Sequence, residues 1–158
     1  MIEMKIMSVQ EVLPTNVPVV LLQEESGSRL LPIFIGRPEA TAIGLSLADQ
    51  NPPRPMTHDL LATVVDLFGF QVERIEITEL REKTFFADIY FRGPNGVEVV
   101  SSRPSDALAI AVRTGATIYA DEQVMEQASY LADDENLSES QIDDFREFLD
   151  SVNPDDFA

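Results

Sequence analysis

The stretch FFADIYFRGPNGVEVVSSRP, residues 85–104, decides the fold, because it joins two strand patterns through a hairpin turn and then enters a helix. Residues 85–91 are mostly apolar and aromatic, as is typical of a strand. Residues 93–96, GPNG, are a strong hairpin signal, and residues 97–100 form the returning strand. Pro104 then favours the first turn of a helix. The stretch predicts an antiparallel sheet that leads directly into a helix.

Working outward from this stretch, alternation of apolar and polar residues and the positions of turns predict the other elements. Further strands are predicted at residues 2–13, 17–22, 30–35, 72–80 and 117–120. Helices are predicted at residues 37–49, 57–69, 104–114, 121–131 and 138–152. The fold class is therefore α+β: a mostly antiparallel or mixed sheet with helices packed against it, in a single compact domain.

The helix at residues 57–69 carries two more specific predictions. Thr57 is expected to be its N-cap, because a threonine side chain can accept a hydrogen bond from the first turn. The apolar residues of this helix are spaced as for a packed face. They are Leu60, Leu61, Val64, Val65 and Phe68.

The acidic charge of the chain is concentrated at its C-terminal end. The net charge is −17, and residues 121–158 hold 13 of the 28 acidic residues beside one basic residue, Arg146. We therefore divide the chain into a main domain, 1–131, and an acidic linker with an amphipathic helix, 132–158. The acidic end is either a solvated surface or a tail that binds a protein partner. The charge argues against a simple non-specific DNA-binding protein, but it leaves room for a nuclease with a local arginine pocket.

The chain has no cysteine, so disulfides and thiolate metal sites are excluded. It also has no signal-peptide core and no apolar run near the roughly 20 residues that span a bilayer. We expect a cytoplasmic protein that does not insert into a membrane.

Residues 53–61 and 102–108 are the best candidates for a functional site. Each segment places an arginine, a proline and an aspartate around the start of a helix, where unpaired N–H groups favour anions. The first segment holds His58, the only histidine of the chain. His58 can act as a general base or a metal ligand, or it can be a helix-start histidine that hydrogen-bonds a nearby loop.

Two aspartates are candidates for binding a divalent metal. Asp59 and Asp106 could hold Mg²⁺ or Mn²⁺, because Mg²⁺ prefers one or two carboxylates together with water and phosphate oxygens. Each is equally explained as a carboxylate that stabilises the positive end of a helix dipole, a contribution of about 0.3–1 kcal/mol.

Three arginines and a serine are candidates for binding substrate. Arg37, Arg54 and Arg103 could form a fork around a phosphate, or each could be a surface clamp on an adjacent carboxylate. Ser105 is better explained as a residue of the first helical turn than as a nucleophile. No phosphate-binding Walker loop, dinucleotide-binding glycine motif or zinc-binding His-Glu-x-x-His is present, so no organic cofactor is expected.

Three blocks in this order resemble the bifunctional nuclease domain family: residues 31–36, LPIFIG, residues 52–60, PPRPMTHDL, and residues 102–108, SRPSDAL. The end of the chain, residues 147–157, is similar to the extension of actinobacterial members. The resemblance implies a compact α+β homodimer and a hydrolase of DNA and RNA. The resemblance identifies positions of this chain that match the family's motifs, but it assigns no role to any of them. Many relatives have an aspartate two residues before the motif arginine, where this chain has Ser101.

Two functions stay open on these grounds. The first is a metal-dependent nuclease with His58, Asp59 and Asp106 as catalytic residues and a metal on the two aspartates. In it, Arg37, Arg54, Arg103 and Ser105 bind the substrate. The second is a non-catalytic dimeric module that binds an anionic ligand or a protein partner.

Overall fold

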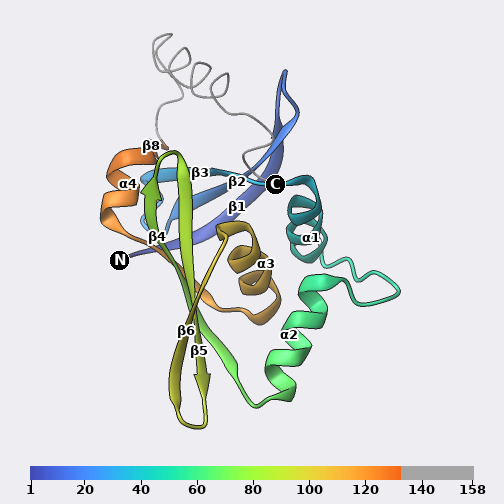
Figure 1. Cartoon of the computed structure of the whole chain (residues 1–158). Coiled ribbons are helices and arrows are strands. Elements are labelled where there is room, and N and C mark those ends of the chain that lie inside the picture. The colour runs from blue at the N-terminus through green and yellow to red at the C-terminus, as the bar shows by residue number, and fades with distance from the viewer. Residues whose placement is uncertain (133–158) are drawn as a thin grey trace.

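The computed structural model describes residues 1–132, and these build one mixed sheet of eight strands with four helices packed against it. The strands are β1 (Ile2–Val12), β2 (Val17–Glu24), β3 (Arg29–Phe34), β4 (Gln71–Arg81), β5 (Thr84–Gly93), β6 (Gly96–Ser102), β7 (Thr117–Ala120) and β8 (Tyr130–Leu131). The helices are α1 (Arg37–Leu47), α2 (Thr57–Leu67), α3 (Pro104–Thr114) and α4 (Glu122–Ala128). The predicted fold class is confirmed (Figure 1). The predicted helix at residues 138–152 lies outside the described residues.

The strand order is β6-β5-β4-β7-β1-β2-β3-β8. The β5–β6 hairpin pairs as its sequence predicts, with Gly93 opposite Gly96 across the turn. All neighbouring strands are antiparallel except β4 and β7, which run parallel. The short strand β7 therefore joins two antiparallel sections, β6-β5-β4 and β1-β2-β3-β8.

The core lies between one face of the sheet and helices α1, α3 and α4. Helix α3 packs on β4, β5 and β7 and is buried over most of its length, which its small alanine side chains permit. Helix α1 packs on β1 and β2 and also contacts α3. The largest fully buried side chains are Val20, Leu22, Leu31, Ile33, Ile43, Ile75, Ile77, Leu108, Ile110, Val124 and Met125.

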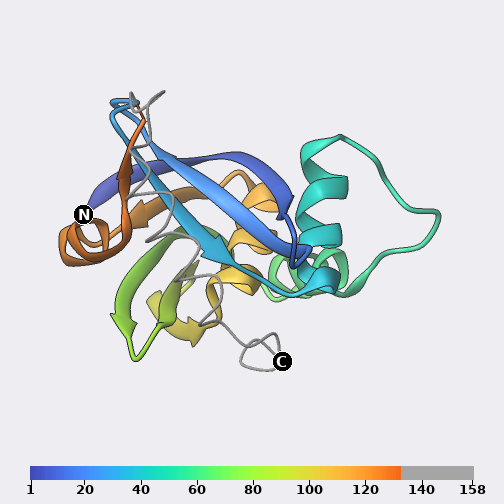
Figure 2. The ribbon, with the colours of Figure 1, turned by 90° about the horizontal axis from the view of Figure 1, so that it is seen from above.

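Helix α2 forms where it is predicted, but it lies outside the main layers and packs chiefly on α3 (Figure 2). The interpretation of its apolar residues as a packed face is wrong: Leu60, Leu61 and Val64 are exposed, and so is Phe68 just beyond the helix. The physical reason is that α3 already covers this part of the sheet. The stripe of α2 that is half-buried contains smaller and polar residues: His58, Asp59, Ala62 and Val65.

Two helix ends in the structure differ from the predicted ones. Met56, and not Thr57, is the N-cap of α2, because the Asp59 carboxylate accepts a hydrogen bond from the Met56 N–H at 2.8 Å and closes the first turn. The helix predicted at residues 121–131 ends at Ala128, because Tyr130 and Leu131 pair with β3 as the short strand β8. None of the helices in residues 1–132 has the length and apolar content needed to span a membrane.

Candidate functional site

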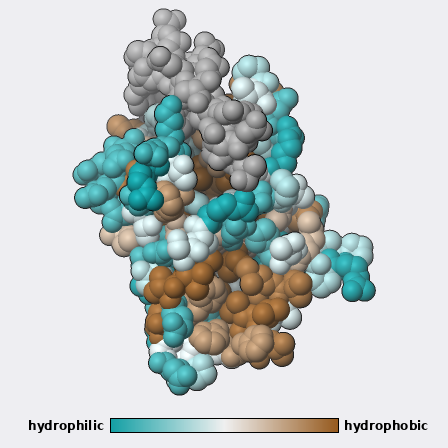
Figure 3. All heavy atoms as spheres, in the orientation of Figure 1, coloured by the Kyte–Doolittle hydropathy of each residue, from teal (hydrophilic) through white to brown (hydrophobic). Residues whose placement is uncertain are grey.

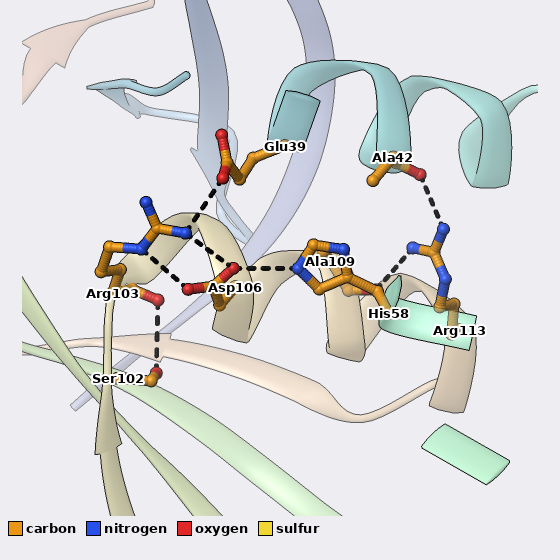
Figure 4. Close-up of polar contacts among 8 residues, drawn as sticks. All are labelled: Glu39, Ala42, His58, Ser102, Arg103, Asp106, Ala109 and Arg113. Carbon is orange, nitrogen blue, oxygen red and sulfur yellow. Dashed lines mark hydrogen bonds and ion pairs between the residues drawn. The ribbon is translucent and has the colours of Figure 1, made fainter. Parts of the chain in front are cut away.

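The two predicted helix starts meet in space. His58 is the second residue of α2 and Asp106 is the third residue of α3. The His58 Nε2 atom lies 2.9 Å from Asp106 Oδ1, in a hydrogen bond that joins residues 48 positions apart (Figure 4). The His58 side chain is only 12 % exposed. The sequence identified these two segments only as similar motifs. In the structure they form one polar cluster.

Arg103 extends this cluster toward α1. As the N-cap residue of α3, it donates from Nε to Asp106 Oδ2 at 2.8 Å and from Nη2 to Asp106 Oδ1 at 3.2 Å. Its Nη2 atom also donates to Glu39 Oε1 at 3.0 Å, in the first turn of α1. Figure 4 shows the resulting line of Glu39, Arg103, Asp106 and His58, contributed by three helices. Arg103 is thus a clamp on carboxylates, and its side chain remains 51 % exposed.

The hydrogen bonds of the cluster determine the charge of Asp106. Burial alone would raise the pKa of Asp106, but the hydrogen bonds from Arg103 and His58 outweigh it and hold the pKa below its ordinary value. Asp106 is therefore ionised near neutral pH. Because an ionised carboxylate only accepts hydrogen bonds, Nε2 of His58 carries the hydrogen of this bond, and Nδ1 is the ring nitrogen left for other contacts.

A second ion pair holds the start of α2 in place. The Arg113 Nε atom donates to Asp59 Oδ1 at 2.6 Å, and its Nη1 and Nη2 atoms donate to the Ala109 and Ala42 carbonyls at 2.8 and 3.0 Å. The Arg113 side chain, which is 9 % exposed, therefore ties α1, α2 and α3 together. The backbone N–H of Met56, followed by Arg113, holds the pKa of Asp59 below its usual range.

Asp59 and Asp106 pair with different arginines, Asp59 with Arg113 and Asp106 with Arg103. Within the described residues no three His, Asp or Glu side chains gather closely enough to hold a metal ion. A metal held by Asp59 and Asp106, and a requirement for Mg²⁺ or Mn²⁺, stay predictions.

The other predicted substrate residues lie at different distances from the cluster. Arg37 pairs with Glu11 at 2.9 Å on the surface. Arg54 is exposed in the connection between α1 and α2, which extends away from the rest of the protein (Figure 2). Ser105 is only 6 % exposed, and no hydrogen bond joins it to the cluster.

A pocket of about 560 Å³ opens beside the cluster. Arg37, Glu39 and Arg103 line it together with the turn at residues 15–18 and the start of α1. Arg37 and Arg103, which the sequence placed before two separate helices, therefore face the same space. The pocket offers two guanidinium groups to an anion, and one carboxylate that opposes it.

Sequence reasoning missed Glu39 and Arg113 as members of the site. Glu39 is not a candidate in the sequence, because a glutamate in a first helical turn is ordinarily explained as stabilising the start of the helix. Arg113 is the single basic residue in the apolar, alanine-rich helix α3, and that isolation is the signal that could have identified it.

Comparisons with known proteins show which family the chain resembles. Residues 20–133 match the model of the bifunctional nuclease domain. An uncharacterized protein of Mycobacterium tuberculosis is 43 % identical over 162 residues, which cover 98 % of this chain and 97 % of that protein. Bifunctional nuclease 1 and bifunctional nuclease 2 of Arabidopsis thaliana are 30 % and 29 % identical. Those two matches cover 61 % and 64 % of this chain, but only 31 % and 32 % of the plant proteins.

Proposed function

The chain belongs to the bifunctional nuclease domain family, and from this premise we propose that it hydrolyses phosphodiester bonds in DNA and RNA. The observation that carries the proposal is the hydrogen bond between His58 and Asp106, beside the arginine-lined pocket. The similar plant proteins are named bifunctional nucleases, and their similarity supports the same class of substrate here.

In the proposed reaction, Arg103 and Arg37 bind the phosphate oxygens through charge-assisted hydrogen bonds. The Nδ1 atom of His58 removes a proton from an attacking water, whose oxygen bonds to phosphorus. The bond between phosphorus and the leaving oxygen then breaks, and the protonated imidazole returns the proton to that oxygen. Asp106 holds Nε2–H of His58 and stabilises the imidazolium that forms.

Arg103 also affects which substrate can bind, because its hydrogen-bond partners in the structure are carboxylates. A phosphate that binds Arg103 must compete with Glu39 and Asp106 for the same N–H groups. This competition favours a substrate that the protein holds at two points over free inorganic phosphate.

The test is cleavage of supercoiled plasmid and single-stranded RNA by the purified protein in Mg²⁺, Mn²⁺ or EDTA. We expect His58→Ala and Asp106→Asn to lose cleavage by about 10²-fold or more, the range that general acid–base catalysis contributes. Asp66→Asn, an exposed aspartate on the same helix as His58, is the matched control and should cleave normally. Equal cleavage by His58→Ala and the parent protein would refute the proposed role of the histidine. The EDTA arm decides whether a metal is required.

A second candidate function is a non-catalytic module that binds an anionic ligand or a protein partner. One observation favours it: Arg103 is already shared between two carboxylates. The family resemblance also favours it, because that resemblance implies an aspartate where this chain has Ser101. Binding of a labelled oligonucleotide without cleavage, weakening steeply as salt rises, would support this module. A partner of the acidic residues 132–158 would instead be lost when those residues are deleted.

A further inference from the structure

The pocket beside Arg103 is larger than a phosphate group needs. Its volume of about 560 Å³ lies within the roughly 300–1,000 Å³ that is typical of pockets for small molecules. Of its lining residues, the proposed reaction uses only Arg37 and Arg103. We call this space the Arg37–Arg103 pocket, and its other walls indicate what lies beside the phosphate.

Most of the other lining residues are apolar. They come from the start of β2 and from the segment that leads from β3 into α1. They are Val17, Pro18, Ile35, Gly36 and Pro38. A nucleobase that leaves its stack is commonly held between apolar or aromatic side chains. These walls therefore suit a flat heterocyclic ring better than a further charged group.

The carboxylate of Glu39 is unexpected in a pocket for an anion. Its Oε1 atom accepts a hydrogen bond from Arg103 Nη2 at 3.0 Å, and its Oε2 atom accepts none within residues 1–132. A Cβ atom at position 36 would collide with Oε2, so the lack of a side chain at Gly36 leaves room for this carboxylate. A carboxylate repels phosphate, but it accepts hydrogen bonds from the amino groups of bases. Glu39 therefore favours a ligand that brings an amino group together with its phosphate.

The turn between β1 and β2 adds a side-chain amide to the pocket. Asn16 lines the pocket at a φ of 54°, and its carbonyl accepts a hydrogen bond from Arg37 Nη2 at 2.9 Å. The amide of its side chain makes no hydrogen bond within residues 1–132. An amide offers a donor and an acceptor side by side, the pattern with which asparagine binds adenine. Asn16 is thus suited to hydrogen-bond the edge of a base.

Other parts of the surface oppose a long contact with a nucleic acid backbone. Figure 3 shows apolar surface below a hydrophilic band, and α2 and β6, which lie in that region, contain no lysine or arginine. The net charge of −17 repels phosphates further. A long row of phosphate contacts is therefore unfavourable, and binding has to depend on one nucleotide held locally.

We propose that the Arg37–Arg103 pocket binds one unstacked nucleobase, with the phosphate of that nucleotide on the two arginines and the edge of the base on Asn16 and Glu39. The inference rests on the proposed function, which identifies the ligand as a nucleotide. A paired base has to leave the duplex before it can enter such a pocket, and the free-energy cost is smallest in a single strand. The protein therefore prefers single-stranded to double-stranded nucleic acid, and it prefers bases that carry an amino group.

The experiment is isothermal titration calorimetry of the full chain with AMP, UMP and ribose 5-phosphate, none of which contains a phosphodiester bond. Ribose 5-phosphate has the sugar and phosphate of AMP but no base. Asn16→Gly removes the amide and keeps the turn, because glycine readily adopts a positive φ. The matched control is Asn95→Gly, in the turn between β5 and β6, which does not line the pocket. Circular dichroism and thermal unfolding establish that both variants are folded.

We expect AMP to bind at least about tenfold more tightly than ribose 5-phosphate, because the base buries apolar surface and gains hydrogen bonds. UMP, whose base has no amino group, should bind less tightly than AMP. Asn16→Gly should lose most of the preference for AMP over ribose 5-phosphate, and Asn95→Gly should keep it. With the His58→Ala protein, a single-stranded oligonucleotide should bind at least about tenfold more tightly than the duplex of the same sequence.

Equal binding of AMP and ribose 5-phosphate, or no measurable binding of AMP, would overturn the proposal. So would an Asn16→Gly variant that prefers AMP as strongly as Asn95→Gly. Equal binding of UMP and AMP would refute the role of Glu39, and equal binding of single strand and duplex would refute the strand preference. The two proposals fail separately: selective binding of AMP without cleavage of plasmid or RNA refutes only the nuclease, and cleavage without selective binding refutes only the base pocket.

Discussion

Replacing Arg113 with methionine should destabilise the protein far more than the loss of a surface arginine. The substitution keeps an unbranched apolar side chain but removes three hydrogen bonds, to Asp59, Ala109 and Ala42. Each contributes about 1 kcal/mol net. The Asp59 side chain is 31 % exposed, so water compensates part of its loss. We expect the free energy of unfolding to fall by about 2–3 kcal/mol.

The assay is urea unfolding followed by circular dichroism, together with a thermal melt. A loss of this size lowers the melting temperature by roughly 5–10 °C in a domain of this length. The matched control is Arg37→Met, because Arg37 also makes an ion pair and a backbone hydrogen bond, but its side chain is 64 % exposed. We expect the control to cost less than about 1 kcal/mol.

A double-mutant cycle with Asp59→Asn isolates the Arg113–Asp59 pair from the two carbonyl contacts. Their coupling should be about 1 kcal/mol, because the residues share one direct ion pair. If Arg113→Met unfolds at the same urea concentration as Arg37→Met, the guanidinium does not tie the three helices together. The positioning of His58 by this contact would then be refuted as well.

Three further predictions concern other parts of the protein. Hydrogen bonds from Arg29, followed by Ser28, lower the pKa of Glu24 from 4.5 to about 2. Its stabilising contribution is therefore complete above pH 4.5 and lost as the pH falls through 2, so Glu24→Gln should flatten the acid loss of stability seen in urea titrations between these pH values. Gly115→Ala should cost about 1 kcal/mol in the same assay, because Gly115 caps α3 at a φ of 72°, and an unchanged midpoint would contradict this. Arg103→Lys keeps the charge but not the bidentate geometry, and it should raise KM for cleavage about tenfold with kcat changed less.

Local signals in the sequence predicted most of the sheet and the helix starts. The GPNG turn at residues 93–96 fixes a hairpin by itself, because its backbone conformation is demanded by proline and glycine. The Arg-Pro starts of α1 and α3 are equally local. His58, Asp106 and Arg103 could be nominated for the same reason, since each lies at a helix start with recognisable chemistry.

The partners of those residues could not be predicted, because they depend on how distant elements pack. Glu39 lies 64 residues from Arg103, and Asp59 lies 54 residues from Arg113. The apolar spacing of α2 predicted a face that avoids water, but spacing alone does not say whether the chain itself covers that face. The structure leaves it exposed, because α3 already occupies the sheet.

The position of β7 has a consequence for how the chain folds. Strands β1–β3 and β4–β6 are each built from neighbouring hairpins, and only the four residues of β7 connect the two sections, by pairing with β1 on one side and β4 on the other. A chain growing on the ribosome can therefore form both sections well before the strand that joins them is made. We expect the insertion of β7, a step between segments far apart in sequence, to limit the folding rate more than either hairpin does.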